Sequence, residues 1–293
     1  MRLFTLYQDA IRLLQQDPDI ENAELDARLL VQHVTGFGRT ELFLHGDRPV
    51  GREETDRLQR LLHRRLRREP LQYILGSCEF WTRTFLVSPA VLIPRPETEF
   101  FLEHVLSTLR KDPVAGPVVD LCTGSGVIAV ILALELGLPV TGVDISLDAL
   151  EIADRNVRLH GLDDRVSLVG GDLLSWCRPG AGLGCIVSNP PYIKADDIRT
   201  LQPEVRDWEP LLALSGGERG LDIIERIIRD SAGLLLPGGW LFMEIGADQG
   251  GSVVELVAAT APGAFAEVRV LTDWAGRPRV LQARKTKNMT GNG

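Results

Sequence analysis

The sequence predicts an α/β protein in which a parallel sheet with intervening helices follows a small helical bundle. From residue 97 to 284, short apolar runs of strand length alternate with helix-length segments, which is typical of parallel strands joined by crossover helices. Residues 1–70 instead carry apolar side chains at helical spacing. Residues 71–96 mix aromatic residues, β-branched residues and three prolines and predict a hairpin and linker, while 285–293 predict a disordered tail.

The N-terminal bundle is predicted to contain three helices, at 1–16, 23–34 and 52–69. Gly36 supplies a stop for the second helix, and Pro70 ends the third. The third helix carries seven arginines against four acidic residues. Two interpretations of this basic face stay open: a solvated surface of the bundle, or a docking surface for an acidic or RNA-bearing partner.

The α/β region is predicted element by element from hydrophobic periodicity. Its strands are expected at 117–121, 139–145, 165–170, 185–189 and 239–246, followed by a closing pair at 265–273 and 277–284. Its helices are expected at 126–137, 147–161 and 220–236. Such a chain places the carboxyl ends of its parallel strands along one crevice, where open α/β sheets bind their ligands.

The composition limits the partners and the compartment. The 293 residues have a net charge of −8, whereas proteins that bind duplex nucleic acid through phosphates usually carry a basic excess. The four cysteines form no C-x-x-C pair, so no metal site is expected. Their sparse spacing fits a reducing compartment, and no apolar run reaches the ~20 residues that span a bilayer. We therefore expect a cytoplasmic protein that requires neither membrane nor nucleic acid and whose acidic charge suits a basic protein partner. We also expect it to be a monomer.

A glycine-rich turn follows the first strand of the α/β region. Gly124 and Gly126 let the backbone approach a ligand closely, and the free N–H groups of the following helix attract an anion. Asp144 ends the next strand, 20 residues after Gly124, where an acid binds ribose hydroxyls. Asp172 follows the third strand and can accept a hydrogen bond from an adenine amino group. These strand ends predict a nucleoside site, and a nicotinamide dehydrogenase is a formal alternative because Ala129 completes a G-x-G-x-x-A pattern.

The fourth strand runs into the tetrapeptide N-P-P-Y at 189–192. Its prolines have no N–H group, so the turn offers carbonyl oxygens, to which the side chain of Asn189 adds another. Such acceptors hold the –NH2 group of a planar nitrogen and stabilise the positive charge that develops as a methyl group arrives, while Tyr192 covers the substrate. A nicotinamide enzyme has no evident use for this turn. Methyl transfer from S-adenosylmethionine does explain the turn. The ribose of this cofactor would lie at Asp144, its adenine near Asp172 and its carboxylate at the glycine turn.

These motifs closely resemble those of the peptide chain release factor glutamine N5-methyltransferases (the HemK/PrmC family), over essentially the whole chain up to residue 284. N-P-P-Y is also shared with DNA adenine and RNA guanine methyltransferases, so a nucleic-acid amino methyltransferase is the alternative. The segments I-P-R-P-E-T-E (93–99) and E-P-L-L-A-L-S-G-G-E-R-G-L (209–221) are much more specific. The matching segments are PLQYILG (70–76), VLIPRPETE (91–99), DLCTGSGVIA (120–129), GVDIS (142–146), IVSNPPYI (186–193), EVRDWEPLLALSGGERGLD (204–222) and RVLQAR (279–284).

The resemblance implies a Rossmann-like, seven-stranded S-adenosylmethionine-dependent methyltransferase domain at 97–284, behind an N-terminal bundle at 1–70 that docks the substrate. It implies methylation of N5 of the glutamine in the Gly-Gly-Gln loop of release factors, which modulates translation termination. The cofactor would contact Cys122, Thr123, Gly124, Ser125, Gly126, Asp144, Asp172, Leu173 and Asn189. The catalytic residues would be Asn189, Pro190 and Tyr192, and the substrate would also contact Pro191 and Arg95, the latter in a wall formed by residues 95–98.

Two positions depart from the family pattern. Cys122 stands where glycine is usual, and a positive φ would strain a side chain there. We expect extended backbone at Cys122 instead, with somewhat altered cofactor affinity. Thr82 lies where a glycine is common in the predicted hairpin, which bears only on the turn of that hairpin.

Overall fold

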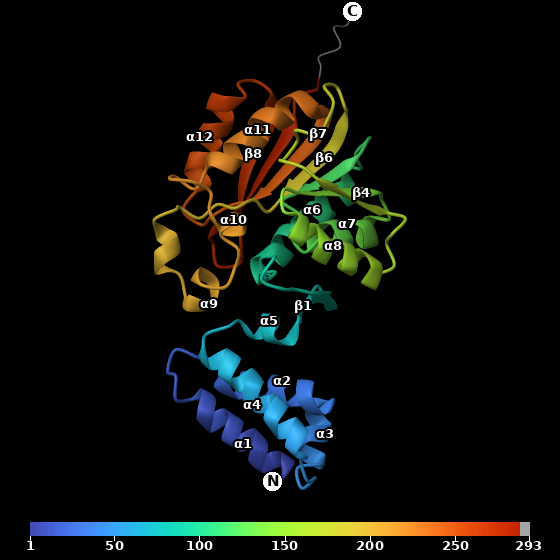
Figure 1. The fold of residues 1–293 in the computed structure, drawn as a ribbon. Helices are drawn as coiled ribbons and strands as arrows, with labels where there is room; N and C mark the ends of the chain where they lie inside the picture. The colour runs from blue at the N-terminus through green and yellow to red at the C-terminus, as the bar shows by residue number, and fades with distance from the viewer. Residues whose placement is uncertain (288–293) are drawn as a thin grey trace, which may run out of the picture. The chain divides into compact units, whose positions relative to one another are not determined.

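The computed structural model describes residues 1–287, and its helices and strands are labelled in Figure 1. The chain divides into two compact units. The first comprises residues 1–77 and 202–208, and the second comprises residues 78–201 and the chain from 209 onward. The sequence placed 202–208 in the α/β domain, whereas the structure groups this segment with the N-terminal helices. The chain therefore leaves the second unit shortly after the N-P-P-Y turn and then returns to it.

The first unit is a bundle of helices around one apolar core. Its helices are α1 (Leu3–Leu14), α2 (Ala23–Thr35), α3 (Arg39–Leu44), α4 (Arg52–Leu66), α5 (Leu71–Leu75) and the short α9 (Pro203–Arg206). The core contains Leu3, Leu30 and Leu58, one from each of α1, α2 and α4. The three predicted helices are confirmed, and Gly36 ends α2 with a left-handed φ of 73°. The prediction of a hairpin and linker is wrong at its start, because Pro70 and Gly76 cap the short helix α5.

A buried ion cluster ties the segment 202–208 to α4. Arg65 donates from Nε to Asp26 Oδ2 at 2.7 Å and from Nη1 to Glu204 Oε1 at 3.0 Å. Arg68 holds both oxygens of Glu204, with Nε and Nη2 each at 2.7 Å. Burial opposes ionisation of Glu204, yet the hydrogen bonds from Arg68 and Arg65 hold its pKa below the usual value. Arg65 and Arg68, which were predicted to belong to a basic face, thus form ion pairs inside the first unit.

The remaining arginines of the predicted basic face divide between internal pairs and solvent. Arg64 is paired with Glu69 through two hydrogen bonds, at 2.8 and 2.5 Å. The exposed arginines of the segment 52–69 are Arg52, Arg57, Arg60 and Arg67. Any docking surface on this helix is therefore smaller than its composition indicates.

A two-stranded hairpin, β1 (Ser77–Phe80) and β2 (Arg83–Leu86), leads into the second unit, which starts at Cys78. Its turn residues Trp81 and Thr82 have φ values of 54° and 56°. A two-residue hairpin loop with both central residues at positive φ is a type I′ turn, which glycine normally favours. Here the backbone N–H of Trp81 donates to Glu99 Oε1 at 2.6 Å, and its indole donates to Glu135 Oε1 at 3.2 Å. These contacts hold a glycine-free turn in place.

Within residues 1–287, a seven-stranded sheet forms the centre of the second unit, as the family resemblance implied. Its order is β5-β4-β3-β6-β7-β9-β8. The first five of these strands run parallel, and β9 pairs antiparallel with both β7 and β8. The strands are β3 (Val118–Leu121), β4 (Val140–Asp144), β5 (Val166–Gly170), β6 (Leu183–Ser188), β7 (Leu235–Glu244), β8 (Phe265–Thr272) and β9 (Pro278–Lys285).

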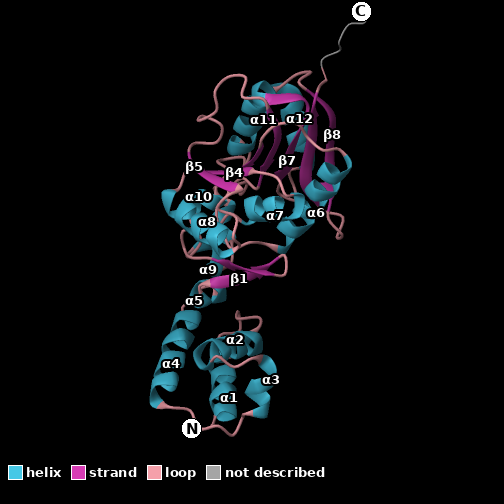
Figure 2. Cartoon of the chain, turned by 90° about the vertical axis from the view of Figure 1, so that its right-hand side faces the viewer, coloured by secondary structure: helices cyan, strands magenta, loops and turns pink. Residues whose placement is uncertain are grey.

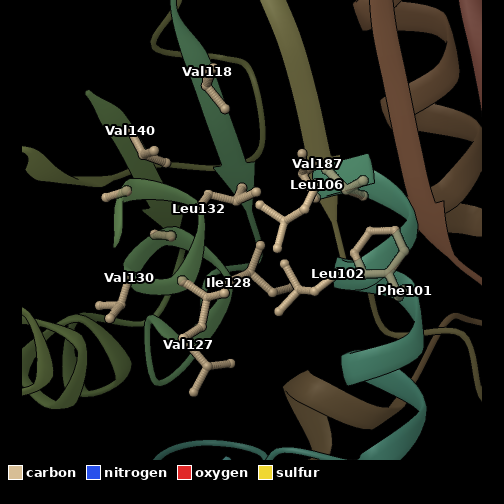
Figure 3. Close-up of a cluster of buried hydrophobic side chains, with 14 of the residues drawn as sticks. Phe101, Leu102, Leu106, Val118, Val127, Ile128, Val130, Leu132, Val140 and Val187 are labelled. Carbon is tan, nitrogen blue, oxygen red and sulfur yellow. The ribbon is translucent and has the colours of Figure 1, made fainter. Parts of the chain in front are cut away.

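Helices cover both faces of this sheet (Figures 1 and 2). The helical elements are α6 (Pro96–Lys111), α7 (Val127–Leu136), α8 (Leu147–Leu159), η1 (Asp197–Thr200), α10 (Leu211–Leu214), α11 (Asp222–Leu234) and α12 (Gly250–Thr260). One apolar layer lies under α6 and α7, where Leu102 and Ile128 pack with strand residues such as Val187 (Figure 3). A second layer lies under α11 and α12, around Ile227 and Val253. Helices α6, α10 and α12 and the 3-10 helix η1 were not predicted from the sequence.

The topology decides where a ligand can lie. Chain order reverses between β3 and β6, which are neighbours in the sheet although β4 and β5 lie between them in sequence. At the carboxyl end, Leu121 pairs with Ser188. Loops that leave the strand ends at such a switch point diverge and open a crevice. The glycine turn and the N-P-P-Y turn are the two loops that leave β3 and β6.

The chain end and the helix lengths bear on two further predictions. Lys285, which the sequence placed in a disordered tail, is the last residue of β9, and 288–293 lie outside the described residues. Among the helices of residues 1–287, none combines the length and apolar character needed to cross a membrane.

Candidate active site

A cavity lies at the carboxyl ends of β3, β4, β5 and β6. Its lining combines residues from four predicted segments: Thr123, Gly124, Asp144, Asp172, Asn189 and Pro191. Cys122, Ser125 and Leu173 also line it, whereas Gly126, Pro190, Tyr192 and Arg95 do not. The structure therefore brings most of the predicted site residues together in one crevice.

The glycine turn forms the floor of the cavity between β3 and α7. Gly124 has a φ of 55°, and Gly126 caps α7 with a φ of 80°. A Cβ at Gly126 would lie 3.1 Å from the Cβ of Ala153 in α8, so glycine also permits close helix packing there. Thr123 donates its hydroxyl to Oδ2 of the buried Asp120 at 2.5 Å. The turn is thereby held rigidly, with its backbone open to the cavity.

Cys122 lies in the left-handed region, with a φ of 57°. The prediction of extended backbone at this position is wrong. The chain must turn sharply out of β3 into the glycine turn, and Thr123 N–H bonds to the carbonyl of Val143 at 3.0 Å, which fixes the path of the chain there. Leu173 at the cavity also has a positive φ, of 52°. Backbone strain of this kind clusters at functional sites.

We expect Cys122→Gly to be more stable than Cys122→Ala by about 1 kcal/mol. A left-handed conformation costs a residue with a Cβ about 1–2 kcal/mol, and the greater freedom of glycine in the unfolded chain offsets part of this gain. The alanine variant is the matched control because both variants lack the thiol. Urea denaturation of both proteins measures the difference, and an alanine variant of equal or higher stability would contradict the assignment of strain.

Asp144 stands at the end of β4, facing the glycine turn. Its Oδ2 accepts from the backbone N–H of Gly124 at 2.8 Å, and its Oδ1 accepts from that of Ser146 at 2.9 Å. Burial raises its pKa, while these backbone hydrogen bonds oppose the rise. Each carboxylate oxygen has a further lone pair, so the oriented group can still accept from a vicinal diol. Its position fits a ribose.

Asp172 follows β5 and is not free in the structure. Its Oδ2 accepts a hydrogen bond from Arg226 Nη2 of α11 at 2.7 Å, and Arg226 lines the same cavity. Arg226 was not singled out from the sequence, because α11 lies 54 residues away along the chain. The ion pair orients the Asp172 carboxylate at the edge of the cavity, where an amino group of a ligand could approach it.

Asn189 immediately follows β6, whose last residue is Ser188. Its Nδ2 lies 3.3 Å from Oγ1 of Thr98 in the first turn of α6. Thr98 is buried and donates its hydroxyl to Glu244 Oε2 at 2.7 Å. Tyr192 donates its hydroxyl to the other oxygen of Glu244, at 3.3 Å. Tyr192 was predicted to cover the substrate, but in the structure its hydroxyl points to a buried carboxylate.

Arg95 also has a partner inside the protein. It donates from Nη2 to Oε2 of the buried Glu209 at 2.5 Å. This ion pair links the two most family-specific segments, I-P-R-P-E-T-E and the segment that begins at Glu209. The neighbours Pro94 and Pro210 line the cavity, although Arg95 itself does not. Arg95 is therefore placed to hold the wall of the cavity.

Sequence comparison relates the chain to characterised families over nearly its whole length. Residues 5–76 match the family model of the PrmC N-terminal domain, and 97–203 match that of the methyltransferase small domain. A release factor glutamine methyltransferase of Koribacter versatilis is 41% identical over 286 residues, covering 97% of this chain and 99% of its own. This chain belongs to the release factor glutamine methyltransferase family. The relative of that name from Geobacter sulfurreducens is 41% identical over 90% of each chain.

A solved structure supports the fold of this family member. A 16S rRNA N2 methyltransferase of T. thermophilus, in complex with AdoMet and guanosine, superimposes with a TM-score of 0.53 and 21% identity. The match covers 71% of this chain and 49% of that chain. It shows a shared methyltransferase fold.

Two residues of the site in this methyltransferase were missed or undervalued from the sequence. Glu244 is the last residue of the apolar strand β7. A single acidic residue at the end of such a strand was the feature of the sequence that could have identified it. Thr98 was predicted only as part of a wall, since its hydrogen bonds to β6 and β7 depend on tertiary packing. Among residues 1–287, no group of three or more His, Cys, Asp and Glu side chains could hold a metal ion.

We expect the stability of this methyltransferase to fall as pH rises from about 5 to about 7. Burial raises the pKa of both Asp120 and Glu244 to about 7, whereas the unfolded chain releases these protons near pH 4. The folded state holds more protons in this window, so the free energy of unfolding decreases with pH. Between pH 5 and pH 8, the wild type should lose about 3 kcal/mol more than Glu244→Gln.

Urea denaturation of both proteins across this pH range tests the expectation. Groups with lowered pKa values act equally in the two proteins, so the comparison isolates Glu244. Parallel stability curves for wild type and variant would show that Glu244 ionises normally.

Proposed function

We propose that this protein transfers a methyl group from S-adenosylmethionine to N5 of the glutamine in the Gly-Gly-Gln loop of peptide chain release factors. The observation that carries the proposal is that Asn189 of the N-P-P-Y turn lines the same cavity as Asp144 and Gly124. A planar amide held at Asn189 would therefore lie beside a nucleoside-based methyl donor. Membership of the release factor glutamine methyltransferase family supports the same substrate.

The residues at the strand ends fit S-adenosylmethionine. The backbone from Thr123 to Gly126 would receive the carboxylate of the methionine part, near the N-terminus of α7. Asp144 would accept from the ribose hydroxyls, and the loop at Asp172 and Leu173 would hold the adenine. Cys122 would contribute to the same wall. When bound, the cofactor supplies an electrophilic methyl group.

The substrate end of the cavity supplies hydrogen-bond acceptors. The side-chain oxygen of Asn189 would accept from one hydrogen of the target –NH2 group. The carbonyl of Pro190, which does not line the cavity but lies between Asn189 and Pro191 in the turn, would accept from the other. An amide nitrogen is a weak nucleophile because its lone pair is delocalised, as the ~18–20 kcal/mol rotation barrier shows. Two acceptors favour a more pyramidal nitrogen and stabilise the positive charge that develops on it. Tyr192 would not contact the target amide directly. It would hold this turn in place through its hydrogen bond to Glu244.

The first unit would provide the docking surface for the release factor. Its exposed arginines Arg52, Arg57, Arg60 and Arg67 would contact an acidic partner. Two of them also have neighbours within the unit, since Arg52 lies 3.7 Å from Asp56 and Arg57 lies 3.1 Å from His33 Nε2. The protein would act as a cytoplasmic monomer, without nucleic acid or membrane, and so modulate translation termination.

Labelling with S-adenosylmethionine that carries a radioactive methyl group tests this function. The purified protein should label a release factor with Gly-Gly-Gln and leave a Gly-Gly-Ala variant of that factor unlabelled. Mass spectrometry should place the methyl group on the glutamine side chain. Ribosomal RNA serves as the comparison substrate, and labelling of RNA instead of release factor, or equal labelling of both release factors, would refute the proposal.

A further inference from the structure

We propose that Thr98 and Glu244 are positioning residues that fix the side-chain amide of Asn189 with its Oδ1 facing the cavity. This inference rests on the proposed function, in which that oxygen accepts from the target amide. The three residues come from separate parts of the fold: Thr98 lies in α6, Asn189 immediately follows β6, and Glu244 is the last residue of β7. They form one continuous chain of hydrogen bonds.

The direction of this chain follows from the buried carboxylate. An ionised Glu244 has no proton to donate, so Thr98 must donate its hydroxyl to Oε2, at 2.7 Å. The hydroxyl of Thr98 then has only lone pairs left. Any group of Asn189 that approaches Thr98 must therefore be a donor.

The side chain of Asn189 has only one such group, its Nδ2, which lies 3.3 Å from Thr98 Oγ1. The reversed amide would bring Oδ1 against the Thr98 lone pairs and lose the hydrogen bond. With Nδ2 held at Thr98, Oδ1 is left for the cavity that Asn189 lines. The Glu244 carboxylate thus determines that Asn189 presents a hydrogen-bond acceptor to the cavity, although Glu244 itself does not line the cavity.

Tyr192 adds to the same arrangement from the other side of Glu244. Its hydroxyl donates to Oε1 at 3.3 Å, so both carboxylate oxygens accept from within the protein. Burial, together with the negative charge of Glu244, raises the pKa of Tyr192, which keeps the phenol a donor. The tyrosine of N-P-P-Y therefore anchors the turn to β7 in this protein.

The charged groups around Glu244 make the hydrogen-bond chain from Glu244 through Thr98 to Asn189 sensitive to pH. Arg279 of β9 favours the ionised carboxylate and Glu97 of α6 opposes it, while burial raises the pKa of Glu244 to about 7. Arg279 is itself paired with Asp273, at 3.1 Å, and lies 3.6 Å from Glu97. A protonated Glu244 can donate to Thr98, which frees the threonine hydroxyl to donate to Oδ1 of a reversed Asn189. The acceptor orientation is therefore no longer enforced as pH falls.

Substitution of Thr98 separates positioning from folding. Thr98→Val keeps the shape of the side chain and removes the hydroxyl, and Thr98→Ser restores the hydroxyl. We expect kcat to fall about tenfold in the valine variant, the factor that one net hydrogen bond supplies, and to recover in the serine variant. The KM for S-adenosylmethionine should change less than twofold. Thr108→Val in the same helix is the matched control, since that hydroxyl bonds to His104 O within α6.

The pH profile supplies a readout that a purely structural role would not move. In wild type, kcat should rise with an apparent pKa near 7, and this step should be absent in Glu244→Gln. Thr98→Ala serves if the valine variant does not fold. Wild-type kcat in folded Thr98→Val or Thr98→Ala, or a step at pH 7 that persists in Glu244→Gln, would overturn the proposal.

A measurement without turnover keeps this inference separable from the proposed function. In protein labelled with 15N, the Asn189 side-chain resonances are assigned by their absence from Asn189→Asp. One of the two amide protons should exchange slowly in wild type, and both should exchange fast in Thr98→Val. Equal exchange in the two proteins refutes the positioning role. Slow exchange in a protein that labels no release factor refutes only the proposed function.

Discussion

Replacement of Asn189 by alanine should lower kcat for glutamine methylation by at least two orders of magnitude. The variant loses the side-chain acceptor that would stabilise the charge developing on the target nitrogen, and loss of one preorganised group of this kind costs about 10²–10³-fold. The affinity for S-adenosylmethionine should weaken by less than tenfold, because Asp144 and the glycine turn are unchanged. Single-turnover methylation and calorimetric titration of the cofactor measure the two effects.

The matched control is Asn22→Ala, which removes an exposed asparagine that makes no side-chain capping bond at the start of α2. It should methylate release factor at the wild-type rate. Turnover retained in Asn189→Ala would show that the acceptor is not needed. A loss of cofactor binding as large as the loss of kcat would assign Asn189 to the cofactor instead.

Glu204→Ala should lower the stability of the first unit by about 3 kcal/mol. The variant leaves Arg65 and Arg68 without a partner that accepts three of their hydrogen bonds, in a place where all three side chains are largely buried. Breaking a buried ion pair by removing one member costs about 3–5 kcal/mol. Arg65 keeps Asp26, so the lower end of this range applies.

Urea denaturation followed by circular dichroism measures this effect in the transition of the helical unit. Glu255→Ala, at an exposed glutamate of α12, should change stability by less than about 0.5 kcal/mol. Equal stability of the two variants would mean that desolvation of the arginines cancels the attraction. Limited proteolysis should also cleave 202–208 faster in Glu204→Ala, because the ion pairs of Glu204 are what hold this segment to the rest of the first unit.

The secondary structure of the α/β unit was largely predictable because periodicity and turn residues act locally. The strand predicted at 139–145 corresponds to β4 (140–144), and the helix predicted at 147–161 corresponds to α8 (147–159). The short helix α5 was missed because aromatic and β-branched residues dominate its neighbourhood. Helix α12 was missed because its sequence, rich in valine, alanine and glycine, carries no clear period.

The candidate site was predictable wherever one strand end supplies one residue. Gly124, Asp144 and Asn189 each follow a strand whose pattern is clear in sequence, and all three line one cavity. Arg226 and Glu244 could not be assigned in this way. Their roles depend on which strand or helix lies beside them, and this is a property of sheet order.

By itself, the sequence of this protein determined the alternation of strands and helices, the glycine turn and the acceptor-rich N-P-P-Y turn, because each depends on neighbouring residues. Only the tertiary structure decided the positive φ of Cys122, since the path out of β3 is imposed by pairing with β4. It also decided that 202–208 joins the helical unit, since ion pairs across more than a hundred residues leave no local pattern. The orientation of Asn189 belongs to the same class, because it depends on a threonine and a glutamate that only folding brings beside it.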